Sequence, residues 1–538
     1  MKVRLLVLLP VLVWGGSLHA YQGHQSQSTS QEHAAEKLGT VSFPTSCAPA
    51  QQKAFERGVA LLHSFWYDKA EQQFKNVIAA DPTCAIAYWG EAMSVWHEIW
   101  DRPDSATLQR GLALVQQGQK MGAKTQRERD YLDALAQFYQ NGDKASFEVR
   151  VAAYSQAMEK LHATYPEDHE AAAFYGLSLL AAAPPRDTTF ANQKKALAML
   201  NVEAVVVPDN PGVAHYIIHS CDSPQMAADG LVAARKYGQI APSAPHAAHM
   251  PGHIFARLGL WQEDIDANLA SVAAAEASGS HGHELHAMDF LNYAYLQVGE
   301  DEKAWAIVQK VNSMDVTMGH DMHEYLDMAR AGFPATYDIE MRHWKEAAAL
   351  QPAKGAKPEN AAITYWARAV GSGHLKDAKA AKQNLAKYDA MVAAVKKGKD
   401  AYMAKYMDTG RDEIRAWVAF AEGKNDDAAK TMRAVADKQD SLGKGEVEIP
   451  AREMLADILL ESGHPEQALA EYERAMTIDP NRFNELYGAA RSAELVKQTA
   501  KADKYYAQLV KNCSGSGSAR PELAKAKEQL AGKTVAGE

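Results

Sequence analysis

The chain has 538 residues, of which 47% are apolar and 23% are charged. This composition supplies enough apolar side chains for a large core and excludes a globally disordered protein. The formal net charge is −10, and the basic residues occur only in short clusters. The chain therefore lacks the charge pattern of a nucleic-acid-binding protein, and we expect no nucleic acid among its partners.

The N-terminal residues predict export. Lys2 and Arg4 precede an apolar run over residues 5–14, and a short segment ending in Ala20 follows, which is the order of a secretory signal peptide. We expect residues 1–20 to be that signal peptide, the mature chain to begin at Tyr21, and the protein to be periplasmic or secreted. No later stretch reaches the roughly 18 apolar residues of a membrane span, so we expect no such span.

The residues after the predicted cleavage site offer little that a core could bury. Residues 22–37 are rich in Gln, Ser and His, a composition typical of a flexible segment. We therefore predict a flexible leader over residues 21–46.

Helical periodicity then runs from about residue 51 to residue 530, with no strand pattern of useful length. Pro208 and Pro242 are 34 residues apart. Two other stretches share a pattern of small residues, aromatic residues and a closing Asp-Pro: Gly58, Tyr67, Ala70, Phe74 and Pro82, and Gly463, Ala468, Tyr472, Ala475 and Pro480.

These residues and the 34-residue spacing resemble the tetratricopeptide repeat (TPR) family, and the chain looks like a secreted, bacterial-type member. The resemblance implies an all-α fold, a TPR-like α-solenoid of stacked antiparallel helix pairs. In such pairs small residues let two helices approach closely, and aromatic residues fill the seam between them. It also implies a concave groove, lined by the first helix of each pair, that binds a protein or peptide ligand.

The turn signals divide the chain after the leader into five parts. We expect N-terminal TPR-like repeats over residues 47–210, central repeats over 211–310, divergent helical repeats over 311–448, a C-terminal pair over 449–512, and a tail with a capping helix over 513–538.

Four cysteines are too few to form the main framework of an exported chain of this length. Cys47 precedes the first helix of the first predicted repeat, and Cys84 opens the first helix of the second. These two are the plausible disulfide pair, and we expect Cys221 and Cys513 to be free.

Common catalytic signatures are missing from the sequence. Residues 532–534 resemble the end of a phosphate-binding loop, but Lys527 stands where that loop requires a glycine. His283 and Glu284 lack the second His of a zinc-protease helix, and no Gly-x-Ser-x-Gly turn occurs. The sequence therefore favours a binding or scaffold protein over an enzyme.

Seven possible metal ligands fall on the first helices of three successive predicted repeats. In the repeat frames set by Pro211, Pro245 and Leu285, the family resemblance places all seven at positions that face the groove: His215, His219, His246, His249, His253, His286 and Asp289. Spacings of three, four and seven keep each set on one helix face. We expect the five His of residues 215–253 to meet in one cavity, with His286 and Asp289 at its rim.

Such a cluster predicts a site for a divalent transition metal ion, namely zinc, copper or nickel, because neutral imidazole is the commonest metal ligand. Asp222 and Asp289 are candidates either for further ligands or for carboxylates that accept the ring N–H.

Three alternatives remain open at this point. The His could be ordinary packing residues, they could bind a peptide carboxylate or another anion as protonated imidazoles, or they could form the site of a metal-dependent hydrolase. Pro251 lies between His249 and His253, where it either kinks the helix or marks a late helix start that would leave His246 and His249 in a loop.

Overall fold

The computed structural model describes residues 36–99, 102–184, 187–314, 322–398, 401–442 and 444–534. The predicted signal peptide and residues 21–35 of the predicted leader lie outside these ranges. The described residues from Lys37 onward belong to one compact unit. Regular structure within the described ranges is helical throughout, which confirms the all-α prediction.

The helices fall into three successive sets. The first set is η1 (Pro49–Gln51), α2 (Gln52–His63), α3 (Tyr67–Ala80), α4 (Ala85–Ser94), α5 (Ser105–Met121), α6 (Gln126–Tyr139), η2 (Gly142–Lys144), α7 (Phe147–Thr164), α8 (His169–Ala181) and α9 (Ala191–Val206). The central set is α10 (Pro211–Cys221), α11 (Ala227–Ile240), α12 (Pro245–His249), α13 (Pro251–Arg257), α14 (Trp261–Ser278), α15 (His281–Gln297) and α16 (Asp301–Ser313). The last set is α17 (Met322–Glu340), α18 (Trp344–Ala349), α19 (Pro358–His374), α20 (Ala378–Lys397), α21 (Ala401–Ala421), α22 (Asn425–Leu442), α23 (Ala451–Glu461), α24 (Pro465–Ala475), α25 (Phe483–Leu495), α26 (Thr499–Asn512) and α27 (Pro521–Thr534).

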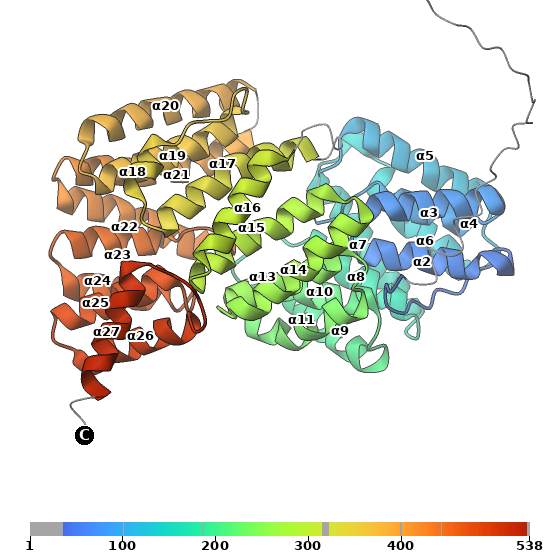
Figure 1. Cartoon of the computed structure of the whole chain (residues 1–538). Coiled ribbons are helices and arrows are strands. Elements are labelled where there is room, and N and C mark those ends of the chain that lie inside the picture. The colour runs from blue at the N-terminus through green and yellow to red at the C-terminus, as the bar shows by residue number, and fades with distance from the viewer. Residues whose placement is uncertain are drawn as a thin grey trace, which may run out of the picture. The chain divides into compact units, whose positions relative to one another are not determined.

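Each helix packs against the helix that follows it, and further contacts link alternate helices, such as α2 with α4, α4 with α6, and α15 with α17. Figure 1 shows the helices succeeding one another from blue to red along the chain. The fold is therefore the predicted TPR-like α-solenoid of stacked antiparallel helix pairs. One consequence is that the first helices of neighbouring pairs lie against each other, which is the arrangement that the histidine prediction requires.

An aromatic ring set against glycine explains how the pairs approach so closely. Phe74 of α3 is fully buried, and its ring lies against Gly58 of α2 and Gly90 of α4. A Cβ atom at Gly58 would come within 2.7 Å of that ring, which is closer than packed atoms allow. Tyr472 of α24 takes the same place against Gly488 of α25. The small residues and the aromatic residues of the repeat pattern therefore pack directly against each other.

The predicted leader is too long at its C-terminal end, because residues 37–46 pack onto the helices. The Lys37 N–H donates to Ser243 Oγ at 2.8 Å, and the Thr40 N–H donates to the Asp209 carbonyl at 2.9 Å. Phe43 is fully buried. The apolar side chains between residues 38 and 43 supply the burial that the Gln- and Ser-rich residues before them cannot.

The far end of the chain also agrees with the sequence analysis. α27 follows the Gly- and Ser-rich residues and packs on α26, with Leu523 and Ala526 buried. None of the helices in the described ranges is long and apolar enough to cross a membrane.

The predicted disulfide is confirmed. Cys47 and Cys84 are bonded, with their Cα atoms 4.7 Å apart, and Cys221 and Cys513 are free and buried. The bond ties the segment before α2 to the residue that precedes α4.

Replacing both Cys47 and Cys84 by serine should destabilise the first helix pairs. The bond closes a loop between residues 37 positions apart, and a cross-link of that length is worth about 3–4 kcal/mol when loop-closure entropy dominates. We expect a lower melting temperature by circular dichroism. A reductant should lower the wild-type melting temperature to that of the variant and leave the variant unchanged; equal shifts in both proteins would contradict the assignment.

Candidate histidine metal centre

Six of the predicted ligands lie on the first helices of three successive central pairs. α10 contacts α13, and α12 contacts α15, so these helices bring their histidines together. Along the chain they are His215 and His219 of α10, His246 and His249 of α12, His253 of α13, and His286 of α15.

Pro251 kinks the helix rather than delaying its start. α12 ends at His249 and α13 begins at Pro251, with Met250 between them. Proline has no N–H, so it cannot donate to the carbonyl of Ala247 four residues earlier, and the helix divides there. His246 and His249 are consequently helical residues and not loop residues.

The six histidines form one continuous cluster, and within it two adjacent groups of three have their ligand nitrogens closest together. The HisA group comprises His215, His219 and His246, and the HisB group comprises His249, His253 and His286. Within each group one possible ligand nitrogen from every ring lies within 4.8 Å of the others. The rings of His246 and His249 connect the two groups, with centroids 6.1 Å apart.

The two predicted rim residues, His286 and Asp289, differ in their relation to these groups. His286 is a full member of the HisB group, since its ring centroid lies 4.3 Å from that of His249. Asp289 is not a member of either group, as far as the described part of the chain is concerned. Burial, together with the charges of Glu448 and Glu446, raises the pKa of Asp289 to about 7.

The ring of His249 is oriented by a buried chain of hydrogen bonds. The side-chain amide nitrogen of Asn268 donates to the carbonyl and carboxylate oxygens of Asp264, which leaves Asn268 Oδ1 as an acceptor. His249 Nδ1 lies 2.6 Å from that oxygen. His249 therefore carries its proton on Nδ1 and directs the lone pair of Nε2 toward the HisB group.

His253 is held by two carboxylates. Its Nδ1 atom lies 3.0 Å from Asp222 Oδ2 and 3.3 Å from Glu446 Oε1. Arg257 bridges the same carboxylates through its Nε and Nη2 atoms, at 3.2 and 2.8 Å, and its Nη1 atom donates to the carbonyl of Lys444. Asp222 thus contacts the ring of His253, and its carboxylate also lies close enough to His253 and Glu446 to be a ligand itself, so both roles that the sequence left open are compatible with its position.

Pairs of Nε2 atoms face one another inside both groups. The Nε2 atoms of His249 and His253 are 2.9 Å apart, and those of His215 and His246 are 3.2 Å apart. Two nitrogens bound to one tetrahedral zinc ion, each at 2.0–2.1 Å, would be about 3.3 Å apart. Without an ion, one proton must stand between each pair, because two bare lone pairs repel. The nitrogen donors suit a transition metal ion. The 3.2 Å separation of His215 and His246 already matches the tetrahedral value, whereas the 2.9 Å separation of His249 and His253 is a hydrogen-bond distance and would have to widen by about 0.4 Å.

Burial keeps most of these rings neutral. It lowers the pKa of His215 and of His286 to about 3, and it holds the pKa values of His219, His246 and His249 well below the ordinary value. Neutral imidazole is the form that binds a metal ion.

His253 is the exception among the six rings. Burial acts to lower its pKa, but the carboxylates of Asp222 and Glu446 outweigh burial and raise the pKa to about 10. In the metal-free protein His253 is therefore an imidazolium that donates from Nε2 to His249. A bound cation would take the place of that proton between the same two nitrogens.

The HisA group has a different set of supporting contacts. His215 Nδ1 donates to the backbone carbonyl of His63 at 2.6 Å. The His63 ring is itself fixed by Glu170 Oε2 at 2.6 Å and by the Tyr216 hydroxyl at 2.9 Å. The ring of Phe65 covers this group and that of Phe290 covers the HisB group.

Several of these supporting residues carried no signal in the sequence. His63 accepts through its backbone carbonyl, which any residue type could supply. Asn268 lies in the middle of α14, the second helix of its pair. Glu446 is 193 residues from His253 along the chain, so no local pattern links the two. Asn268 alone offered a signal: it is a polar residue on the apolar face of its helix, where it is buried. A buried amide needs a hydrogen-bond partner, so its position predicts one.

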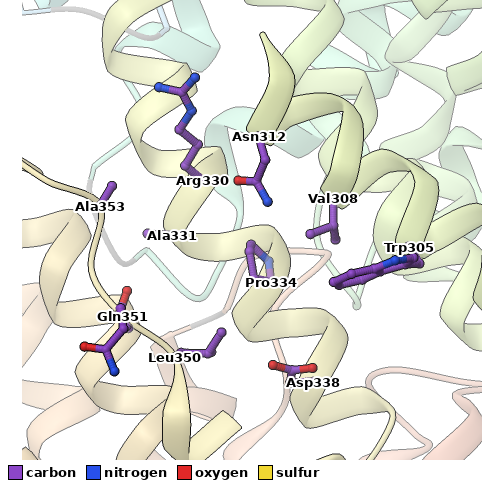
Figure 2. Close-up of a pocket in the computed structure, with 11 residues that line it drawn as sticks. Trp305, Val308, Asn312, Arg330, Ala331, Pro334, Asp338, Leu350, Gln351 and Ala353 are labelled. Atoms are coloured by element: carbon purple, nitrogen blue, oxygen red, sulfur yellow. The ribbon is translucent and has the colours of Figure 1, made fainter. Parts of the chain in front are cut away.

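A separate pocket of about 320 Å³ lies beside α16 and α17 (Figure 2). Arg330 and Asp338 of α17 and Trp305 of α16 line it, and burial together with the charge of Glu346 raises the pKa of Asp338 to about 7. None of the seven predicted ligands lines this pocket, so it is distinct from both histidine groups.

No protein-family model matches the chain, and no curated protein is similar to it in sequence. Among solved structures, the human IFIT1 dimer with m7Gppp-AAAA aligns over 80% of this chain and 90% of its own, with 12% identity and a TM-score of 0.37. The P58(IPK) TPR domain aligns over 68% of this chain and 99% of its own, with 16% identity and a TM-score of 0.21. Likeness at this level does not bear on the function of either histidine group.

Replacing Gly252 by alanine should disturb the support of His249. A Cβ atom there would lie 2.6 Å from both Asn268 Nδ2 and Asp264 Oδ1. We expect a loss of about 1–3 kcal/mol in the free energy of unfolding, as for overpacked buried sites, measured by denaturant titration.

Gly238→Ala in α11 is the matched control, because nothing lies within 4 Å of its added Cβ. That change should leave stability unaltered or raise it by up to about 1 kcal/mol. Similar losses in both variants would contradict the close packing of Gly252 against Asn268.

Proposed function

We propose that this chain is an exported helical-repeat binding protein that holds a divalent transition metal ion, zinc, copper or nickel, through His249, His253 and His286. The observation that carries the proposal is that possible ligand nitrogens of His249, His253 and His286 lie within 4.8 Å of one another. The rings of His249 and His253 each have their other nitrogen satisfied by an acceptor outside the group. Metal-binding histidines in proteins are oriented in this way.

The protonation states favour a metal over an anion. A site for a peptide carboxylate would need positively charged imidazoles, but burial lowers the pKa of five of the six rings. The one charged ring, His253, is already paired with Asp222 and Glu446. Arg257 is paired with the same two carboxylates, so the positive charges near His253 are already balanced and none is left to hold an incoming anion.

A metal-dependent hydrolase is the second candidate, and one observation favours it. Asp289 lies one helical turn from His286 on α15, and its pKa of about 7 suits a general base. Hydrolysis of an activated ester by the zinc-loaded protein, lost in Asp289→Asn with zinc binding intact, would support this candidate. The binding protein is preferred because no further catalytic group accompanies Asp289 among the predicted ligands.

The chain purified as it is exported, stripped of metal and then titrated with Zn²⁺ or Co²⁺, should bind the ion through nitrogen ligands at about 2.0–2.1 Å by X-ray absorption. A His249→Ala, His253→Ala double variant should lose that binding, since two of three ligands are gone. His464→Ala, at an exposed histidine, should bind as the wild type does. Equal binding by the double variant and the control, or none by the wild type, would refute the proposal.

Export itself has an independent test. The basic residues Lys2 and Arg4 and the apolar run after them lead us to expect cleavage after Ala20. Mass spectrometry of the protein from the exported fraction should give an N-terminus at Tyr21. A chain in that fraction that retains Met1 would overturn the expectation.

A further inference from the structure

We propose that His215, His219 and His246 form a second metal site that prefers monovalent copper, beside the divalent site of the HisB group. This inference rests on the proposed function, because it divides one histidine cluster between two ions. Its basis is the difference between the surroundings of the two groups.

The HisA group has its own ligand geometry. His215 donates from Nδ1 to a backbone carbonyl, and its Nε2 atom lies 3.2 Å from His246 Nε2. The Nε2 atom of His219 is buried and has no hydrogen-bond partner among the described residues. A buried nitrogen left in this state costs about 1–3 kcal/mol, a cost that a bound ion would remove.

The two groups differ in the carboxylates that touch their rings, although the charge of Glu446 also acts on His219. The HisB group has Asp222 and Glu446 in contact with His253. Within the described ranges, neither His215 nor His219 has a hydrogen bond or ion pair to a carboxylate. The carboxylate of Glu170, which belongs to the network behind His215, is bonded to the His63 ring and to the side chain of Asn210.

The immediate neighbours of the HisA group are aromatic. The ring centroid of Phe65 lies 4.4 Å from that of His215, 5.4 Å from that of His219 and 5.5 Å from that of His246. Tyr237 stacks on His215 at 5.0 Å. Phe65 adopts φ of 51°, a left-handed backbone conformation that is costly for a bulky residue and that packing must maintain.

These surroundings favour a singly charged ion. The cost of moving an ion from water into a medium of low polarity grows with the square of its charge, so a divalent ion pays about four times as much as a monovalent one of equal size. Among the described residues no carboxylate is bonded to His215 or His219, whose contacts are with a backbone carbonyl and other rings. Copper is the transition metal that is stable as a monovalent ion, and imidazole is a suitable ligand for it.

The test uses the mature chain, stripped of metal and kept free of oxygen. It is first loaded with one equivalent of Zn²⁺ and then titrated with Cu⁺ against a chromophoric Cu⁺ chelator. We expect one equivalent of Cu⁺ to bind without releasing zinc. Copper X-ray absorption should report Cu⁺ with three nitrogen ligands.

A matched pair of variants assigns the sites. His219→Gln and His286→Gln each remove one of three ligands from a partly buried position. His219→Gln should weaken Cu⁺ binding by about 100-fold and change Zn²⁺ binding by less than about threefold, and His286→Gln should do the reverse. His464→Gln should alter neither, and circular dichroism checks that each variant is folded.

Displacement of zinc by copper, a total of one ion per chain, or equal losses of both metals in both variants would overturn the second site while leaving the proposed function intact. Tighter binding of Zn²⁺ than of Cu⁺ to the HisA group, seen in His286→Gln, would overturn the preference for monovalent copper. If the wild type binds neither ion, the proposed function and this inference both fail. The zinc-loaded wild-type titration decides the question even where a variant does not fold.

Discussion

Each helix pair of this protein has an apolar face that only the next pair can cover, and the rest of the structure depends on that constraint. The contact that satisfies it is an aromatic ring against glycine, as with Phe74 between Gly58 and Gly90. Because the contact recurs, successive first helices are held at close range along the chain. Residues that occupy corresponding positions on these helices then become neighbours, although about 30 residues separate them in sequence.

The histidine cluster uses this arrangement. α10, α12 with α13, and α15 are consecutive first helices, and their imidazoles approach to ring distances of 4.3–6.3 Å. Proximity alone does not make a metal site, since buried rings could simply pack on each other. Behind the rings, acceptors take the Nδ1 protons and leave the Nε2 atoms to face one another: Asn268 and Asp222 in the HisB group, and the His63 carbonyl in the HisA group.

The sequence predicted the elements that depend on local pattern. Periodicity predicted the helices, and the repeat frame placed Cys47 near Cys84 and His215 near His246. It did not predict features set by tertiary contacts. The division into two groups follows from how α12 and α13 meet α10 and α15, and the support from Glu446 follows from the packing of distant pairs. The burial of Phe43 was missed because its segment is short and follows a polar stretch that dominates the local composition.

The position of Glu446 has a consequence for the order in which the protein is made. The six histidines all belong to the first 290 residues, whereas Glu446 is 193 residues beyond His253. At about 5–20 residues per second, the ribosome needs roughly 10–40 s to cover that interval. During this time all six histidines have been synthesised, but Glu446, one of the two carboxylates that raise the pKa of His253, has not. The nascent cluster therefore differs electrostatically from the finished one, because the contact of Glu446 with His253 and Arg257 forms only when the C-terminal repeats have folded against the central helices.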